Sequence, residues 1–350
     1  MVDCSKMADV DGVYASPGGA ELLHALGNAL RSQDGRLTFP VRGGIPRFLR
    51  YLPAETPADS ERLDRLNCAA RARGWADALS DVLGRESPMY RYVTDEAHAR
   101  FVEVLPVAGA TILEVGAGLG QITTVIARKA SVVCALEVVA GQAEFVAERA
   151  RQCGQRNVAV ACGGDDCWLP YRTGLFDVAV LNLVLEWCGM RDPGDAQTSQ
   201  VRLLAEVKRV LRPGGMLYLC TKNRFGLHYL LGIPDEHVQG IRFGSAMPRW
   251  LSRAVLSLRR RGRPAGLLHS YRGIRRMLHA AGYSELRSYW AVPEMRFPRQ
   301  LIATDAEAIA AARGSGLVEG DSRRVRTVMP LVPGALVKYV TPGLVFTARA

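Results

Sequence analysis

Short apolar runs alternate with segments of helical periodicity through the middle of the chain. Seven runs rich in Val, Ile, Leu and Phe are predicted to be strands, at residues 111–115, 131–136, 158–161, 176–181, 216–220, 286–292 and 343–349. Helical spacing predicts helices within 61–105 and at 122–126, 140–153, 199–211 and 270–282. This alternation predicts an α/β protein with a doubly wound, mostly parallel, seven-stranded sheet covered on both faces.

The predicted sheet leaves two segments outside it. Residues 1–60 form a small leading module, in which 36–49 reads as a short strand, a glycine turn and an extended exit. The remaining residues, 61–350, form one domain with an insertion at about 222–270, after the fifth strand. We therefore expect two parts of very different size.

Composition favours an ordinary folded protein in a reducing compartment. The 350 residues are 48% hydrophobic and 23% charged, and no apolar run reaches the roughly 18 residues that a membrane span needs. The first residues are polar and acidic, so we expect no secretion signal. The eight cysteines form no C-x-x-C pair, so we expect no metal site and a cytoplasmic location.

The net charge of +11 comes mainly from one segment. Residues 237–284 contain no Asp, Glu or Lys, whereas they hold ten arginines, at 242, 249, 253, 259, 260, 261, 263, 272, 275 and 276. Such a segment suits a phosphate-bearing substrate, an anionic membrane surface or nucleic acid. An ordinary solvated arginine-rich face explains the charge equally well. Aromatic residues are sparse among these arginines, which makes nucleic acid the weaker alternative.

A glycine loop follows the first predicted strand, with the sequence E-V-G-A-G-L-G over residues 114–120. Glycines there permit positive φ and let a ligand approach the backbone. A dinucleotide loop would read G-x-G-x-x-G, but Gln121 stands where its third glycine would be. The Glu114 carboxylate would repel a pyrophosphate, whereas it can bind an ammonium group. The loop therefore favours a ligand that carries an amino acid.

Acidic or amide side chains follow the next three predicted strands. Glu137 can accept both hydroxyls of a ribose, or it is a surface residue at a strand end. Asp165 and Asp166 can accept from an adenine amino group, or they are turn residues. Asn182 and Glu186 stand at the edge where open α/β sheets bind ligands, although Glu186 also suits the first turn of a helix.

These motifs together resemble the class I S-adenosylmethionine (SAM)-dependent methyltransferases, in their small-molecule branch. The resemblance covers about residues 105–221 and includes G-D-x-x-x-L-P, F-D-x-x, x-L-V-L-E and L-R-P-G-G in the same order. It implies a Rossmann-like fold, SAM as cofactor and a set of cofactor-binding residues: Glu114, Gly116, Ala117, Gly118, Gly120, Glu137, Asp165, Asp166 and Asn182. The leading module resembles a zinc-ribbon-like module that lacks its metal cysteines.

Methyl transfer from a sulfonium needs alignment more than it needs acid–base help. His228 and His237 in the insertion can serve as a general base toward a hydroxyl, with Glu186 as a further catalytic candidate; each also suits a structural role. No N/D-P-P-Y/F motif follows the fourth strand, which argues against an exocyclic nitrogen acceptor. We expect an enzyme that methylates oxygen or carbon of a small molecule, glycan or lipid-linked sugar. An RNA methyltransferase using residues 242–276, or a non-catalytic SAM-binding scaffold, are the alternatives.

Overall fold

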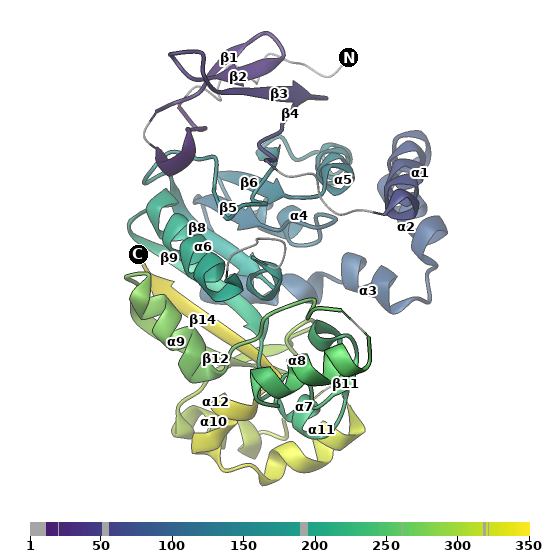
Figure 1. Ribbon diagram of the computed structural model, residues 1–350, viewed down its shortest axis with the longest axis vertical. Helices are drawn as coiled ribbons and strands as arrows, with labels where there is room; N and C mark the ends of the chain where they lie inside the picture. Colours follow the sequence, from purple (N-terminus) through teal and green to yellow (C-terminus); the bar gives the residue numbers. More distant parts are fainter. Residues whose placement is uncertain are drawn as a thin grey trace. The chain divides into compact units, whose positions relative to one another are not determined.

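The computed structural model describes residues 12–19, 21–50, 56–189, 195–260, 262–317, 320 and 322–350 (Figure 1). The chain divides into two compact units. Unit 1 comprises Met1–Val180 and Glu206–Met216, and unit 2 comprises Leu181–Ala205 and Leu217–Ala350.

Backbone hydrogen bonds join eight strands in the order β13-β12-β14-β9-β8-β5-β6-β7. Their bounds are β5 (Thr111–Val115), β6 (Val132–Glu137), β7 (Val158–Cys162), β8 (Phe176–Asn182), β9 (Leu211–Lys222), β12 (Ser284–Val292), β13 (Gln300–Ala303) and β14 (Gly343–Arg349). β5, β6 and β7 pair in parallel, whereas β12 pairs antiparallel with β13 and β14. The α/β Rossmann-like fold is confirmed, with one strand more than the seven predicted.

The helices of unit 1 begin and end at residues that suit helix termini. Their bounds are α1 (Pro57–Arg73), α2 (Trp75–Leu83), α3 (Pro88–Thr94), the 3-10 helix η3 (Glu96–Val104), α4 (Thr123–Ile126) and α5 (Ala140–Gln152). The Thr56 hydroxyl caps α1 by accepting from the Asp59 amide, and the Ser87 hydroxyl caps α3 in the same way. Gly74, at φ 101°, separates α1 from α2.

The leading module is a small antiparallel sheet in unit 1. Its strands are β1 (His24–Leu26), β2 (Ala29–Arg31), β3 (Thr38–Arg42) and β4 (Ile45–Pro46), preceded by the 3-10 helix η2 (Pro17–Gly19). Phe48 is fully buried, and its ring lies 5.1 Å from Tyr14, 5.0 Å from Phe39 and 5.8 Å from Trp168. The Phe48 amide donates to the Cys162 carbonyl oxygen at 2.7 Å. Aromatic packing and this backbone bond attach the module to the end of β7.

Unit 2 contains two groups of short elements between its strands. The predicted insertion holds α7 (Leu227–Leu230), β10 (Pro234–Asp235), η5 (Glu236–Val238), β11 (Ile241–Arg242) and α8 (Arg249–Leu258), and is followed by α9 (Tyr271–Ala280). A second group, absent from the predictions, lies between β12 and β14: β13, α10 (Ala306–Gly314), α11 (Arg323–Val328), η6 (Met329–Leu331) and α12 (Gly334–Val340). Trp290 of β12 and Ile309, Val325, Met329 and Val337 form a buried core for this group.

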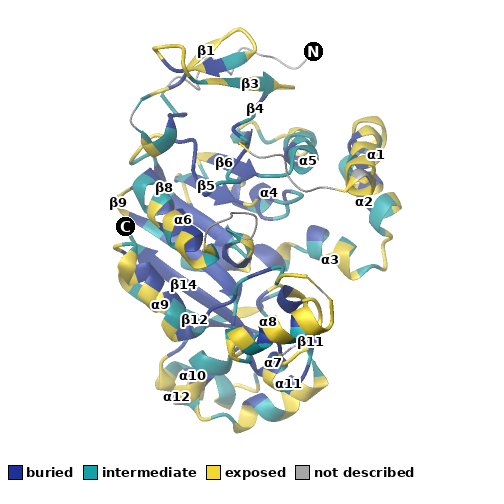
Figure 2. Ribbon diagram, viewed as in Figure 1, coloured by how far each residue is buried: buried dark blue, intermediate teal, exposed yellow. Residues whose placement is uncertain are grey.

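Three elements, β8, α6 (Ala196–Val210) and β9, have residues in both units, and the bounds of α6 and β9 differ most from the predictions. α6 begins three residues before the predicted helix, and η4 (Leu185–Trp187) follows β8. The strand predicted at 216–220 is longer, because β9 begins at Leu211 and contains the Pro-Gly-Gly sequence that reads as a helix stop. Figure 2 shows that the central strands are the most buried part of the chain. Among the described residues, no helix is both long and apolar enough to cross a bilayer.

Candidate functional site

The glycine loop that follows β5 is held against the end of β6. The Gly116 amide donates to the Leu136 carbonyl oxygen at 2.8 Å, and the Ala117 amide donates to the same oxygen at 3.2 Å. Gly116, Gly118 and Gly120 have φ values of 76°, 57° and 76°. Because L side chains rarely adopt these values, the backbone of the loop requires glycine at all three positions.

Glu137, the last residue of β6, connects the loop to helix α5. Its Oε2 accepts from the Gly118 amide at 2.8 Å, and its Oε1 accepts from the Val139 amide at 2.9 Å. The side chain is buried, so these two charge-assisted bonds offset the loss of hydration. A carboxylate has about four lone-pair directions, so a carboxylate at the end of a strand can accept from several donors at once.

Glu114 is the buried acid at the other side of the loop. It is 2% exposed, and its Oε2 accepts from the Thr123 hydroxyl at 2.5 Å. Burial raises the pKa of Glu114 to about 8, an effect that the Thr123 hydrogen bond opposes and the nearby Glu137 charge reinforces. An ammonium group beside this carboxyl would favour its ionised form, so Glu114 suits a cationic ligand.

Arg149 of α5 holds the loop through backbone carbonyl oxygens, and the sequence analysis did not identify it. Its Nη1 donates to the carbonyl oxygens of Leu119 at 2.9 Å and of Val93 at 3.1 Å, and its guanidinium lies 4.1 Å from the Trp75 ring centroid. Burial lowers the pKa of Arg149 to about 10. The guanidinium thus fixes the turn between Gly118 and Gly120 through a backbone carbonyl, which no local sequence pattern reveals.

Asp165 and Asp166, predicted near the adenine, contact the exit of the leading module. The Arg50 amide donates to Asp165 Oδ2 at 3.0 Å, and Arg50 Nε lies 3.0 Å from Asp166 Oδ2. The Arg50 guanidinium also lies 5.6 Å from the Trp168 ring centroid. No local pattern indicates that Arg50 joins this group, because 115 residues separate it from Asp165.

The predicted catalytic residues belong to unit 2, where Glu186 and His237 lie in one buried polar group. Glu186 is 1% exposed and accepts from the Thr221 hydroxyl at 2.8 Å. Burial raises the pKa of Glu186, whereas hydrogen bonds, including the bond from Thr221, and the nearby Lys222 charge oppose the rise. Lys222 in turn forms an ion pair with Glu236.

His237 is oriented by a neighbouring carboxylate. Its Nδ1 lies 3.1 Å from Asp235 Oδ1, and the Trp187 ring covers the imidazole at a centroid distance of 4.7 Å. The side chain is fully buried, and its Nε2 has no hydrogen-bond partner among the described residues. A carboxylate on Nδ1 places the proton there and leaves Nε2 as an acceptor. Asp235, which the sequence analysis missed, is therefore the residue that orients the His237 ring.

The two remaining predicted residues of unit 2 lie apart from this pair. His228 is on α7, where its ring packs 3.8 Å from the Tyr229 ring centroid. Asn182 is the last residue of β8 and is half-buried.

Comparison with known proteins identifies the segment that contains the loop. Residues 113–219 match the family model described as "Methyltransferase domain". This segment is a class I SAM-dependent methyltransferase domain. The matched segment includes Glu114, the three glycines, Glu137, Asp165 and Asp166. The cofactor of this domain is SAM.

The relatives of the methyltransferase domain cover the chain only in part. The biotin biosynthesis bifunctional protein BioHC of Cellvibrio japonicus is 32% identical over 110 residues, which are 31% of this chain and 19% of that protein. The chain therefore spans about a fifth of the length of this curated relative. A SAM-dependent methyltransferase from Aquifex aeolicus is 16% identical with a TM-score of 0.38, covering 60% of this chain and 88% of that one. The [4+2]-cyclase SpnF is 22% identical with a TM-score of 0.41, covering 78% and 79%.

The residues of the methyltransferase domain fit the chemistry of SAM. A carboxyl group that ionises beside a cation suits the methionine ammonium, and a carboxylate at the end of β6 suits the ribose hydroxyls. A Cβ built on Gly118 would meet only the end of the Gln121 side chain, at 3.5 Å, so the loop backbone is open to a ligand on that side. Thr123, Arg149 and Arg50 support these groups from positions that the sequence analysis did not find.

Glu114→Gln is expected to change how stability depends on pH. The pKa of Glu114 is raised in the folded protein, so its stabilising contribution is complete below about pH 4.5 and is lost as the pH rises toward 8. Relative to the variant, the wild type should lose up to about 1.4 kcal/mol of unfolding free energy per pH unit within this window. Urea unfolding at several pH values measures the difference. The exposed Glu61→Gln is the control, and parallel curves for wild type and Glu114→Gln would contradict the assignment.

Proposed function

We propose that this protein transfers the methyl group of SAM to an oxygen or carbon atom of a small molecule, glycan or lipid-linked sugar in the cytoplasm. The observation that carries the proposal is the loop that Glu137 holds through the Gly118 amide, beside the buried Glu114. Glu114 supplies a carboxylate for an ammonium group and Glu137 supplies one for a ribose, and both lie in the segment that matches methyltransferase domains. The small antiparallel module, which resembles a metal-free zinc ribbon, packs through its aromatic residues.

We assign the cofactor contacts by the chemistry of each residue. Glu114 binds the ammonium, the backbone of Gly116, Ala117, Gly118 and Gly120 approaches the methionine and ribose, and Glu137 binds both ribose hydroxyls. Asp165 and Asp166 accept from the adenine amino group, with Arg50 fixing their orientation. By the resemblance to class I methyltransferases, we also assign Asn182, at the end of β8, to the cofactor. When bound, SAM supplies an activated methyl group on a sulfonium.

His237 is the residue we assign as general base. A substrate hydroxyl would donate to Nε2, which is buried without a partner among the described residues, and its proton would pass to that nitrogen as oxygen attacks the methyl carbon. Bound SAM would supply the methyl carbon, and its sulfur would keep the electron pair of the carbon–sulfur bond as the new carbon–oxygen bond forms. Asp235 stabilises the imidazolium that results. Glu186 lies in the same buried polar group as a further catalytic candidate, and His228 on α7 is the other candidate for the base.

The function is tested by incubation of the protein with methyl-labelled SAM and cell extract, followed by identification of the labelled product. A labelled ether or C-methyl product of low molecular weight, glycan or lipid would support the proposal. Label in RNA would favour the arginine-rich segment 242–276 as an RNA-binding track. Binding of S-adenosylhomocysteine without any labelled product would instead indicate a SAM-binding scaffold.

Gly116→Val is expected to abolish binding of S-adenosylhomocysteine in calorimetry. A β-branched side chain at φ 76° distorts the loop, and it occupies the space through which a ligand would contact the loop backbone. Gly154→Val is the matched control, because Gly154 has φ 71° and a Cβ there would meet nothing within 4 Å. Both variants carry backbone strain, but only Gly116→Val should lose the ligand. Equal affinities in the two variants would overturn the loop assignment.

His237→Gln is expected to lower the rate of methyl transfer about 10²- to 10⁴-fold, which is the usual contribution of a general base. Binding of S-adenosylhomocysteine should not change, because the cofactor contacts belong to other residues. His228→Gln is the control and should retain most of the rate. Full activity of His237→Gln, with the cofactor bound normally, would remove His237 from the reaction.

A further inference from the structure

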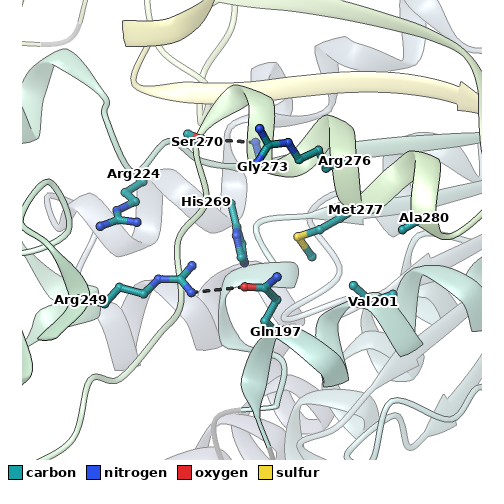
Figure 3. A pocket seen from close by; sticks show the side chains of 10 residues that line it. All are labelled: Gln197, Val201, Arg224, Arg249, His269, Ser270, Gly273, Arg276, Met277 and Ala280. Carbon is teal, nitrogen blue, oxygen red and sulfur yellow. Dashed lines mark hydrogen bonds between the residues drawn. The ribbon is translucent and has the colours of Figure 1, made fainter.

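A cavity of about 320 Å³ in unit 2 is lined by cations and lies outside the residues assigned above. Arg224, Arg249 and Arg276 line it together with His269 and Ser270 (Figure 3). Its volume is at the lower end of the range for small-molecule sites. The ten lining residues include no Asp or Glu, so the charge of the cavity wall is positive.

The arginines of the cavity are held in place by neutral groups. Arg224 donates from Nε to the Ser245 carbonyl oxygen and from Nη2 to the Met247 carbonyl oxygen, both at 2.7 Å. Arg249 Nη1 donates to Gln197 Oε1 at 3.3 Å. The pKa of Arg224 is lowered by burial and by the nearby Arg249 charge. Two guanidinium groups that repel each other, fixed by carbonyl oxygens, are stabilised when an anion binds between them.

The N-terminus of α9 adds to the positive potential. The Ser270 hydroxyl caps this ten-residue helix by accepting from the Gly273 amide at 3.2 Å, and both residues line the cavity. The amides of a first helical turn favour anions. Glycine at position 273 avoids crowding there, because a Cβ would lie only 3.3 Å from the His269 side chain, which is closer than most Cβ contacts.

His269 contributes an acceptor rather than a charge. It is 6% exposed, and its Nε2 lies 2.6 Å from Gln200 Oε1. The Gln200 amide nitrogen donates to the Leu185 and Leu267 carbonyl oxygens, so its Oε1 must accept and His269 Nε2 must carry the proton. Burial and the two arginines lower the pKa of His269 to about 4. At neutral pH its Nδ1 can therefore accept a hydrogen bond from a hydroxyl of the ligand.

The other side of the cavity is apolar. Figure 3 shows Arg224 and Arg249 on one side and Val201, Met277 and Ala280 on the opposite side. A simple inorganic anion would leave these side chains without a partner. We propose that this cavity binds the phosphate group of an amphiphilic phosphate ester, with the hydrocarbon part of the ester against Val201 and Met277. This inference rests on the proposed function in taking the phosphate ester to be the methyl acceptor.

Calorimetry with inorganic phosphate and with hexyl phosphate tests the cavity. Both probes should bind the wild-type protein, and hexyl phosphate should bind about tenfold more tightly because it buries apolar surface. Arg276→Gln should weaken both probes about tenfold through the loss of a charge-assisted hydrogen bond. Arg275→Gln is the matched control, because Arg275 is the preceding residue on α9, is also exposed and is not among the residues that line the cavity.

Vesicles of phosphatidylcholine with phosphatidic acid distinguish the two sources of such an ester. Recruitment that Arg276→Gln weakens and Arg275→Gln does not would assign a lipid head group. Binding of hexyl phosphate with the same dependence, but without recruitment, would assign a soluble ester. The inference is wrong if neither probe binds the wild type, or if both variants weaken binding equally. S-adenosylhomocysteine is titrated into the wild-type protein in parallel. If it does not bind, the proposed function is contradicted, whereas the result for the phosphate probes still stands.

Discussion

The geometry of the cofactor loop depends on two hydrogen bonds that the carboxylate of Glu137 accepts from backbone amides. One oxygen holds the Gly118 amide and the other holds the Val139 amide at the start of α5. A single side chain thus joins the end of β6, the loop after β5 and the following helix. Because the group is buried, the alternative to these bonds is an unpaired charge in a medium of low polarity. The loop is therefore ordered before any ligand binds, and this preorganisation lowers the entropic cost of binding.

The central strands were predictable because each is a short apolar run between a helix and a turn. The prediction of 111–115 coincides with β5, and that of 343–349 coincides with β14. The region between β12 and β14 was not predicted. Its helices, such as α11 with six residues, are too short to show a periodic pattern. They are stabilised by the core around Trp290, which is a tertiary effect that a single sequence does not display.

The candidate site shows the same division. The loop and Glu137 follow from strand ends and glycine spacing, both of which are local features. Arg149, Asp235 and the arginine cavity depend on contacts that sequence order hides, such as the bond from Arg149 to the Leu119 carbonyl 30 residues away. The excess of arginine in 237–284 was visible in the sequence. Which of these side chains converge on one cavity was fixed only by the fold of unit 2.

The attachment of the leading module to β7 has a consequence for association. β7 is the outermost strand on its side of the sheet, and an open strand edge is a template for pairing with another chain. The Phe48 amide and the bridge between Arg47 and Cys162 occupy part of that edge. A chain cut before residue 56 would expose both the unpaired backbone of β7 and the ring of Trp168. Its first failure would be edge-to-edge aggregation of otherwise folded molecules.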